Sequence, residues 1–112
     1  MKPERPCTDW HLNAISWSLT APDGSTVKLT RSETLLLNAL ASRPGQTVPK
    51  DALIGAIGHQ PDTYDPRRME IMIRRLRNKV KTQSSIQLPL ETDHGMGYAF
   101  AAQITLVQVN VG

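Results

Sequence analysis

Residues 67–81, RRMEIMIRRLRNKVK, contain seven Lys or Arg side chains and one acid. This segment carries a net charge of 7 − 1 = +6, so the rest of the chain, whose total is +3, carries 3 − 6 = −3. Guanidinium groups form paired hydrogen bonds with phosphates and with the O6 and N7 edge of guanine. A basic helix face can simply be solvated, but here like-charge repulsion also destabilises the helix that carries it. The concentration of charge therefore predicts a surface that docks a polyanion.

A helical projection of this segment separates its apolar side chains from its basic ones. At about 100° per residue, apolar side chains spaced i, i+4, i+7 and i+11 share one side. They are Met69, Ile73, Leu76 and Val80. The opposite side holds Arg67, Arg68, Arg74, Arg75 and Lys81, with Arg77 and Lys79 on its two flanks. Ile71 lies among these cations and Met72 beside them. We predict that the apolar stripe belongs to the core and that the basic side faces a partner, where Ile71 could contact a thymine methyl group.

Start and stop signals place a first helix over 31–42. Thr30 and Glu33 have the spacing of a capping box, in which each side chain accepts a hydrogen bond from the other residue's backbone amide. The sequence RPG at residues 43–45 ends the helix. The leucines predicted to face inward are Leu36, Leu37 and Leu40, with Leu35 less certain.

Two further helices follow. Pro49 opens a short helix over 49–57, because its missing amide proton costs nothing at a first helical position. The residues expected to face inward are Ala52, Leu53, Ala56 and Ile57. Asp65 as N-cap and Pro66 at the first position then open the basic helix, which we predict over 66–81.

Alternating segments surround the helices. Period-two spacing and the turn PDG predict a small antiparallel sheet over 10–29. We interpret Trp10 and Trp17 as covering the core face of this sheet, in preference to stacking on a ligand, because tryptophan is usually buried for its large area. The two glycines in residues 86–101 indicate a β-hairpin whose tip or returning arm needs backbone freedom.

The chain is predicted to hold one domain, over 10–102. Its 112 residues suit a single core. We expect residues 1–9 to form a flexible leader, and we assign no role to the lone cysteine, Cys7. The alternating tail 103–112 could add a strand, pair with a partner or remain disordered, and the sequence does not choose among these.

The order of strands, three helices with the third one basic, and a hairpin resembles a winged helix-turn-helix of the OmpR/PhoB type, the effector domain of bacterial response regulators. LTRSETLLLNALASRPGQTVPKDALIGAIG resembles the family's helix and turn pattern, RRMEIMIRRLRNKV its recognition helix, and LETDHGMGYAF its wing. The resemblance covers about residues 10–100. It implies an α+β fold and sequence-specific binding of double-stranded DNA in bacterial transcription control, within a two-component phosphorelay.

The resemblance also implies roles for individual residues. Arg75 matches an arginine that reads bases in the major groove, and Arg74 and Arg77 match side chains at or near phosphates. Ile71 matches a residue that touches DNA in the groove. The implied DNA-binding set is Arg67, Arg68, Ile71, Met72, Arg74, Arg75, Arg77, Lys79, Thr92, His94 and Tyr98.

The chain departs from the family pattern in the wing. Thr92 matches a wing threonine, and Tyr98 a tyrosine whose hydroxyl can meet a phosphate. His94 replaces the arginine that enters the minor groove, and it brings charge only when protonated. Glu91 and Asp93 beside it leave the wing close to neutral or acidic.

Three further departures lie in the helices. Met72 replaces a histidine and cannot donate a hydrogen bond to a phosphate. Pro49 stands where the family has Ser or Thr, and Ile57 where it has Trp.

The sequence also suggests binding partners, and it leaves one alternative function to be weighed. The resemblance implies a contact of the loop His59–Tyr64 with RNA polymerase, although the sequence of this loop is also typical of an ordinary surface turn. It also implies homodimers on DNA.

The alternative function is a basic amphipathic helix that binds an acidic protein or an anionic membrane. The scattered histidines and the single cysteine predict no catalytic residue, metal site, cofactor or small-molecule substrate, and hence no enzyme. Without an apolar stretch near 20 residues or a signal peptide, the expected location is the cytoplasm.

Overall fold

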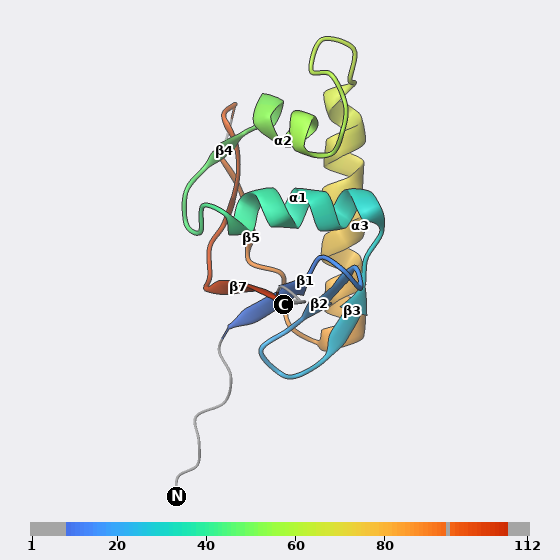
Figure 1. Cartoon of the computed structure of the whole chain (residues 1–112), viewed down its shortest axis with the longest axis vertical. Coiled ribbons are helices and arrows are strands. Elements are labelled where there is room, and N and C mark those ends of the chain that lie inside the picture. Colours follow the sequence, from blue (N-terminus) through green and yellow to red (C-terminus); the bar gives the residue numbers. More distant parts are fainter. Residues whose placement is uncertain (1–8, 94, 108–112) are drawn as a thin grey trace, which may run out of the picture.

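The computed structural model describes residues 9–93 and 95–107 (Figure 1). Three short strands come first, then α1, then a strand and two helices, then three more strands. The elements are β1 Trp10–Asn13, β2 Ser18–Thr20, β3 Thr26–Lys28, α1 Arg31–Ala41, β4 Val48–Pro49, α2 Lys50–Ala56, α3 Pro66–Ser84, β5 Leu90–Asp93, β6 Gly97–Phe100 and β7 Ile104–Val107. The predicted α+β class, with three helices and a C-terminal hairpin, is confirmed.

The strands form two sheets. The first has the order β3-β2-β1-β7, in which β1, β2 and β3 are antiparallel and β7 lies parallel to β1. The second has the order β4-β6-β5, so the hairpin of β5 and β6, the wing, is joined to the strand before α2. The described part of the tail therefore adds an edge strand, one of the outcomes that the sequence left open.

The residues predicted to cap α1 and α3 make the expected hydrogen bonds. Thr30 Oγ1 accepts from the Glu33 amide at 3.1 Å, and the Glu33 carboxylate accepts from the Thr30 amide at 2.9 Å. Asp65 caps α3 by accepting from the Arg67 amide at 3.0 Å, and Pro66 follows it. Past residue 81, α3 continues to Ser84, where Ser85 ends it in the left-handed conformation with φ 66°.

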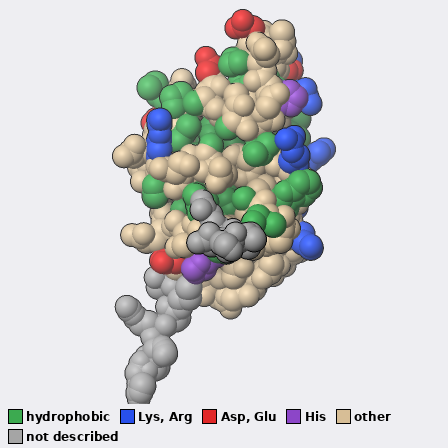
Figure 2. All heavy atoms as spheres, in the orientation of Figure 1, with side chains coloured by type: hydrophobic (Ala, Val, Ile, Leu, Met, Phe, Trp, Pro, Cys, Tyr) green, Lys and Arg blue, Asp and Glu red, His purple; other side chains and the backbone are tan. Residues whose placement is uncertain are grey.

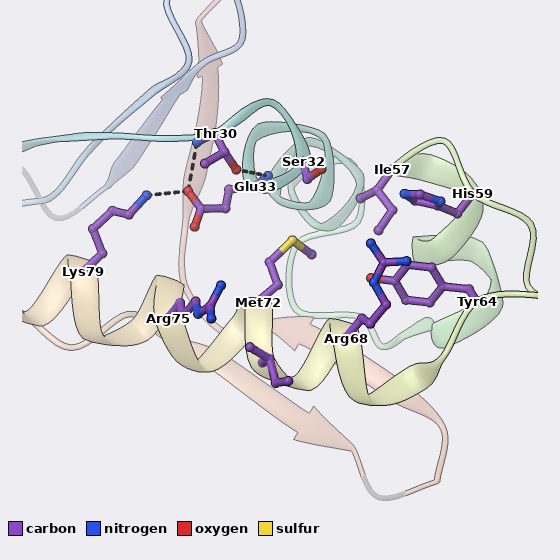
Figure 3. Close-up of a pocket in the computed structure, with 11 residues that line it drawn as sticks. Thr30, Ser32, Glu33, Ile57, His59, Tyr64, Arg68, Met72, Arg75 and Lys79 are labelled. Atoms are coloured by element: carbon purple, nitrogen blue, oxygen red, sulfur yellow. Dashed lines mark hydrogen bonds and ion pairs between the residues drawn. The ribbon is translucent and has the colours of Figure 1, made fainter.

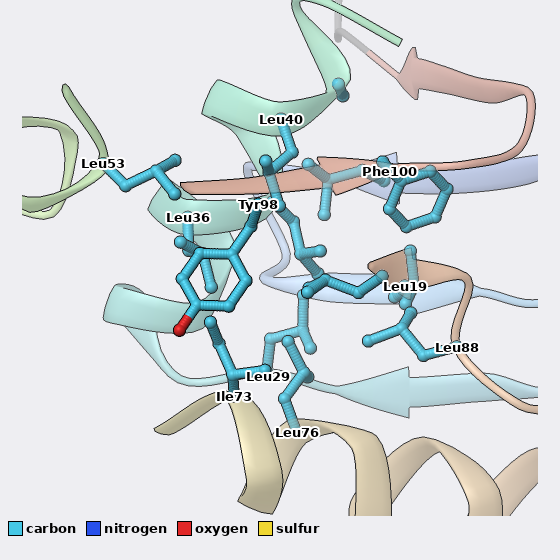
Figure 4. Close-up of a cluster of buried hydrophobic side chains, with 14 of the residues drawn as sticks. Leu19, Leu29, Leu36, Leu40, Leu53, Ile73, Leu76, Leu88, Tyr98 and Phe100 are labelled. Carbon is cyan, nitrogen blue, oxygen red and sulfur yellow. The ribbon is translucent and has the colours of Figure 1, made fainter. Parts of the chain in front are cut away.

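The core lies between α1, α3 and the strands (Figure 4). Leu36 and Leu40 of α1, with Ile73 and Leu76 of α3, are among its fully buried side chains, and the ring of Phe100 meets Trp10 edge to face with centroids 6.0 Å apart. The whole predicted stripe of α3 is buried. Because the core occupies this side of α3, the other side is fixed toward solvent.

Two predictions about inward-facing residues are wrong. Trp10 is 2% exposed, but Trp17 is 44% exposed. Trp17 ends the turn 14–17 in the left-handed conformation with φ 54°, and β2 begins only at Ser18.

In α2, Ala52 is exposed and Ala56 only half-buried. Leu53 and Ile57 are buried as expected, and the side chain buried in place of Ala52 is Ile54. The helix begins at Lys50, with Pro49 as its N-cap, and turns Ile54 toward the core.

Candidate nucleic-acid interface

The outward side of α3 is an exposed basic surface. Arg67, Arg68, Arg74 and Arg75 are exposed, and Ile71 among them is 42% exposed. In Figure 2 the Lys and Arg side chains gather along the right-hand edge, over α3. We call these five side chains the basic face. Their exposure around one apolar side chain suits contact with the edges and backbone of a nucleic acid.

The two flanking cations of α3 are anchored to the domain. Arg77 donates from Nη2 to the Leu90 carbonyl oxygen at 2.6 Å, at the start of the wing. On the other flank, Lys79 Nζ lies 2.6 Å from Glu33 Oε1 and donates to the Lys28 carbonyl oxygen at 3.2 Å. Glu33 is buried and also caps α1, so this ion pair joins α3 to α1 and β3. Arg77 and Lys79 therefore position the basic face as well as adding charge to it.

A groove of about 540 Å³ borders the basic face on the side of α1. Figure 3 shows α3 along one wall, the start of α1 opposite and the loop after α2 at one end. We call it the α1–α3 groove. Its lining includes Ser32, Ile57, Tyr64, Arg68, Met72 and Arg75. The groove combines an apolar surface with guanidinium groups at its edge.

Three side chains pack together at one end of this groove. The Arg68 guanidinium carbon lies 5.2 Å from the centroid of the Tyr64 ring, and the His59 ring lies 5.0 Å from the same ring. Tyr64 is only 9% exposed. The loop that follows α2 is thus packed against the first turn of α3, and cation–π attraction holds Arg68 in place.

A second hollow, of about 330 Å³, lies on the opposite flank, between α3 and the wing. Its cations are Lys50, Arg74 and Arg77, and Thr92 and Tyr98 face them from the wing. Burial raises the pKa of the Tyr98 hydroxyl, nearby Glu70 raises it further, and Arg77 partly offsets both. Tyr98 therefore stays neutral and can act as a hydrogen-bond donor at the edge of the hollow.

The wing itself is acidic and apolar. Asp93 accepts a hydrogen bond from Thr47 Oγ1 at 2.8 Å, and Glu91 shares a separate hollow with these two residues. Met96, near the tip, is 61% exposed. His94 lies outside the described residues. The cations that the family pattern leads one to expect on the wing are absent from residues 90–100 of the sequence.

Within 9–93 and 95–107, no three His, Cys, Asp or Glu side chains come together as metal ligands. Over that same part of the chain, the helices are too short or too polar to span a bilayer.

Comparison with known proteins decides the family. Residues 24–100 match the family model described as "Transcriptional regulatory protein, C terminal". The chain belongs to this family. The OmpR/PhoB resemblance of the three motifs is thereby confirmed.

Relatives of this transcriptional regulatory domain are longer proteins. The regulatory protein VirG of Agrobacterium tumefaciens (strain 15955) is 32% identical over 97 residues, which is 87% of this chain and 36% of VirG. TorR of Escherichia coli (strain K12), the TorCAD operon transcriptional regulatory protein, is 34% identical over 83 residues, 73% of this chain and 34% of TorR. The chain thus spans about a third of the length of these relatives.

Solved structures give the same fold. The DNA-binding domain of CpxR from Escherichia coli superimposes with a TM-score of 0.69 at 26% identity. The match covers 90% of this chain and 98% of the CpxR domain. The RstA DNA-binding domain of Klebsiella pneumoniae, solved in complex with the RstA box, has a TM-score of 0.64 at 27% identity. The match covers 80% of this chain and 88% of the RstA domain. The domain is a winged helix.

Sequence reasoning missed two features of this winged-helix site. Lys50 lines the hollow beside the wing together with Arg74 and Arg77. A cation in the first turn of the helix before the recognition helix could have pointed to it. The stack of Tyr64 on Arg68 was also missed. Its signal was the four-residue spacing of an aromatic ring and an arginine at the start of a helix.

Proposed function

We propose that this domain binds double-stranded DNA in a sequence-specific manner as part of a bacterial transcriptional regulator, with α3 in the major groove and the wing near the minor groove. One observation carries the proposal: the apolar stripe of α3 is buried while four arginines surround exposed Ile71 on the other side. A major groove about 12 Å wide admits a helix with such a face. Family membership supports the same conclusion.

The residues of the basic face take different roles in this proposal. Arg75 reads a base edge, Ile71 contacts a thymine methyl group, and Arg67 and Arg74 bind phosphates. Met72 lines the side of the contact without donating a hydrogen bond. Phosphate contacts position the domain, and base contacts make it selective.

The wing-side residues and anchored cations complete the interface. Thr92 and Tyr98 offer hydroxyls to the backbone that passes the wing, and His94 approaches the minor groove. Arg77 and Lys79 contribute charge from positions that their hydrogen bonds fix. The wing contributes less charge than α3, since residues 90–100 contain no Lys or Arg.

The alternative, an amphipathic helix that inserts into a membrane or a protein groove, has less support. Such a helix needs a free apolar side. In this fold Met69, Ile73, Leu76 and Val80 are all buried in the domain's own core.

Two cellular partners and a location belong to the proposal. The exposed residues 59–63 form a surface that can contact RNA polymerase, and dimerisation on repeated sites stays a prediction. With DNA as the target, the cytoplasm is the proposed location. Substitutions in 59–63 that leave DNA affinity intact but lower transcription in vitro would support the polymerase contact, and unchanged transcription would remove it.

Site selection from random duplexes at stated salt, followed by Arg75→Ala, tests the function. The variant is expected to lose about tenfold in affinity for the selected duplex and much less for random duplex, because a base contact is lost. The matched control is Arg43→Ala, an exposed arginine outside α3. Failure of the unmodified domain to select any sequence would overturn the proposal, and an equal loss on both duplexes would remove Arg75 from base reading.

A further inference from the structure

We infer that β7 is a contact surface between two copies of this chain, whose β7 strands pair antiparallel about a two-fold axis at Thr105 and join their sheets into one. The partner is a second copy of the chain, and the contact forms without DNA. It uses neither the basic face of α3 nor the wing, so it goes beyond the proposed function and does not depend on it.

The open edge of the first sheet is the first argument. β7 is the last strand in the order β3-β2-β1-β7, and in Figure 1 it lies beside β1, away from β2 and β3. The Trp10 amide donates to the Gln103 carbonyl oxygen at 3.0 Å, so in this parallel ladder the backbone groups of Thr105 also face β1. Those of Ile104 and Leu106 point outward. Within residues 9–93 and 95–107, no strand pairs with them.

The opposite edge of the same sheet is closed. The Lys28 carbonyl oxygen of β3 accepts a hydrogen bond from Lys79 of α3 at 3.2 Å. The Lys28 side chain is exposed, and a lysine on an edge strand opposes further pairing. Residues 104–111, ITLVQVNV, contain neither a charged residue nor a proline. The edge at β7 therefore lacks the charge and the proline that keep many edge strands unpaired.

The register of the pairing follows from the backbone groups that point outward. With Thr105 opposite Thr105 of the copy, Ile104 of each strand lies opposite Leu106 of the other, and each such pair exchanges both of its hydrogen bonds. A shift of the copy along β7 leaves Ile104 or Leu106 unpaired within the described strand. The axis at Thr105 therefore satisfies every outward backbone group of β7.

The side chains of β7 are compatible with a second copy of the same strand. Thr105 and Val107 are exposed, whereas Ile104 is buried and Leu106 half-buried against the core. The axis places the two Thr105 side chains in a non-hydrogen-bonded pair, where cross-strand neighbours are closest and threonines pair favourably. β7 brings no charge into this contact, so two copies do not repel each other and a charged partner strand finds no complement.

Sedimentation velocity of the full chain without DNA is the first arm of the test. A contact of this size is weak, so the protein is measured from about 10 to about 1000 µM, and we expect a reversible dimer at the upper end. Thr105→Lys places like charges side by side at the axis, and Thr105→Glu does the same with acids. Each variant alone should be monomeric. An equal mixture of the two should regain the dimer, because the opposite charges attract.

Disulfide trapping is the second arm, and it tests the register. In a Cys7→Ser background, Thr105→Cys should form a cross-linked dimer with oxidised glutathione, because directly opposite residues lie within reach of a disulfide. Thr26→Cys, exposed on the closed edge at β3, is the matched control and should stay monomeric. Leu106→Pro removes an outward amide proton only, so it should abolish the dimer while thermal unfolding stays cooperative.

The exposed turn before β2 offers a different route by which two copies could associate. Ile15 is 64% exposed and Trp17 44% exposed in this turn. Ile15→Ser combined with Trp17→Ser should leave the dimer unchanged. Loss of the dimer in this variant, with the dimer intact in both Thr105 variants, would place the contact at the turn and overturn the inference.

Two further results would overturn it. One is a chain that stays monomeric over the whole concentration range, and the other is a Thr105→Cys variant that cross-links no more than Thr26→Cys. Because every measurement is made without DNA, either failure leaves the DNA-binding proposal standing.

Discussion

The outward side of α3 and the wing lie beside each other, yet they are built in opposite ways. The α3 side carries exposed arginines and is held by a buried apolar stripe and by Lys79, paired with Glu33. Residues 90–100 of the wing contain two acidic residues but no Lys or Arg. Met96, near the tip, is exposed. The difference predicts that, in the proposed complex, electrostatic attraction to DNA is concentrated on α3, while the wing contributes shape and hydroxyl groups.

The two regions also differ in how they are held. Gly97 packs so closely on β4 that a Cβ atom there would overlap the Val48 carbonyl oxygen. The wing thus depends on a backbone contact, whereas α3 depends on side chains from several elements. Substitutions at each of these contacts test the difference between the two regions.

The largest effect is expected from Gly97→Ala. The added methyl group must displace β4, so the free energy of unfolding should fall by about 3 kcal/mol or more. Gly95→Ala is the control, because Gly95 has φ +74° and open space around it, and should cost only about 1 kcal/mol of conformational strain. Urea unfolding measures both. Equal costs would show that the wing does not rely on the close contact of Gly97 with Val48.

A smaller effect is expected at the ion pair that anchors α3. Glu33→Gln should lower the free energy of unfolding by about 2 kcal/mol, because it leaves Lys79 without a charged partner in a partly buried position. In a double-mutant cycle with Lys79→Met, the coupling energy should be about 1 kcal/mol. Additive single and double variants would mean that the pair does not hold α3 to α1.

The smallest effect concerns Tyr98, at the joint of the two regions. Its pKa is raised in the folded state, mainly by burial, so above pH 10 the unfolded chain loses this proton first. The folded protein then binds more protons, and stability must fall as pH rises. Tyr98→Phe should flatten this fall relative to the unmodified domain in unfolding measured from pH 9 upward. Parallel curves for the two proteins would show that Tyr98 ionises as freely as in the unfolded chain.

Local signals made much of the fold predictable. The capping box of α1, Asp65 and Pro66 at the start of α3, and the stripe of α3 depend on residues within a few positions of each other. The same periodicity placed the arginines on one outward side. Trp17 was misassigned because the period-two pattern does not reveal the left-handed turn that interrupts it.

Contacts between distant elements were not predictable. The parallel pairing of β7 with β1 joins opposite ends of the chain, so no local pattern encodes it. The sequence did not predict the ion pair of Lys79, because its partner Glu33 lies 46 positions away in the chain. Of the candidate site, the composition of the basic face followed from the sequence, but the grooves beside it needed the packed helices.

The most direct test of the central claim compares two matched double variants in equilibrium binding to the selected duplex. Arg74→Ala with Arg75→Ala removes charge from α3, and Thr92→Ala with Met96→Ala removes two exposed uncharged side chains of the wing. We expect a loss of about a hundredfold for the α3 variant and less than about fivefold for the wing variant, with both proteins folded. An equal or larger loss for the wing variant would contradict the claim that α3 carries the binding.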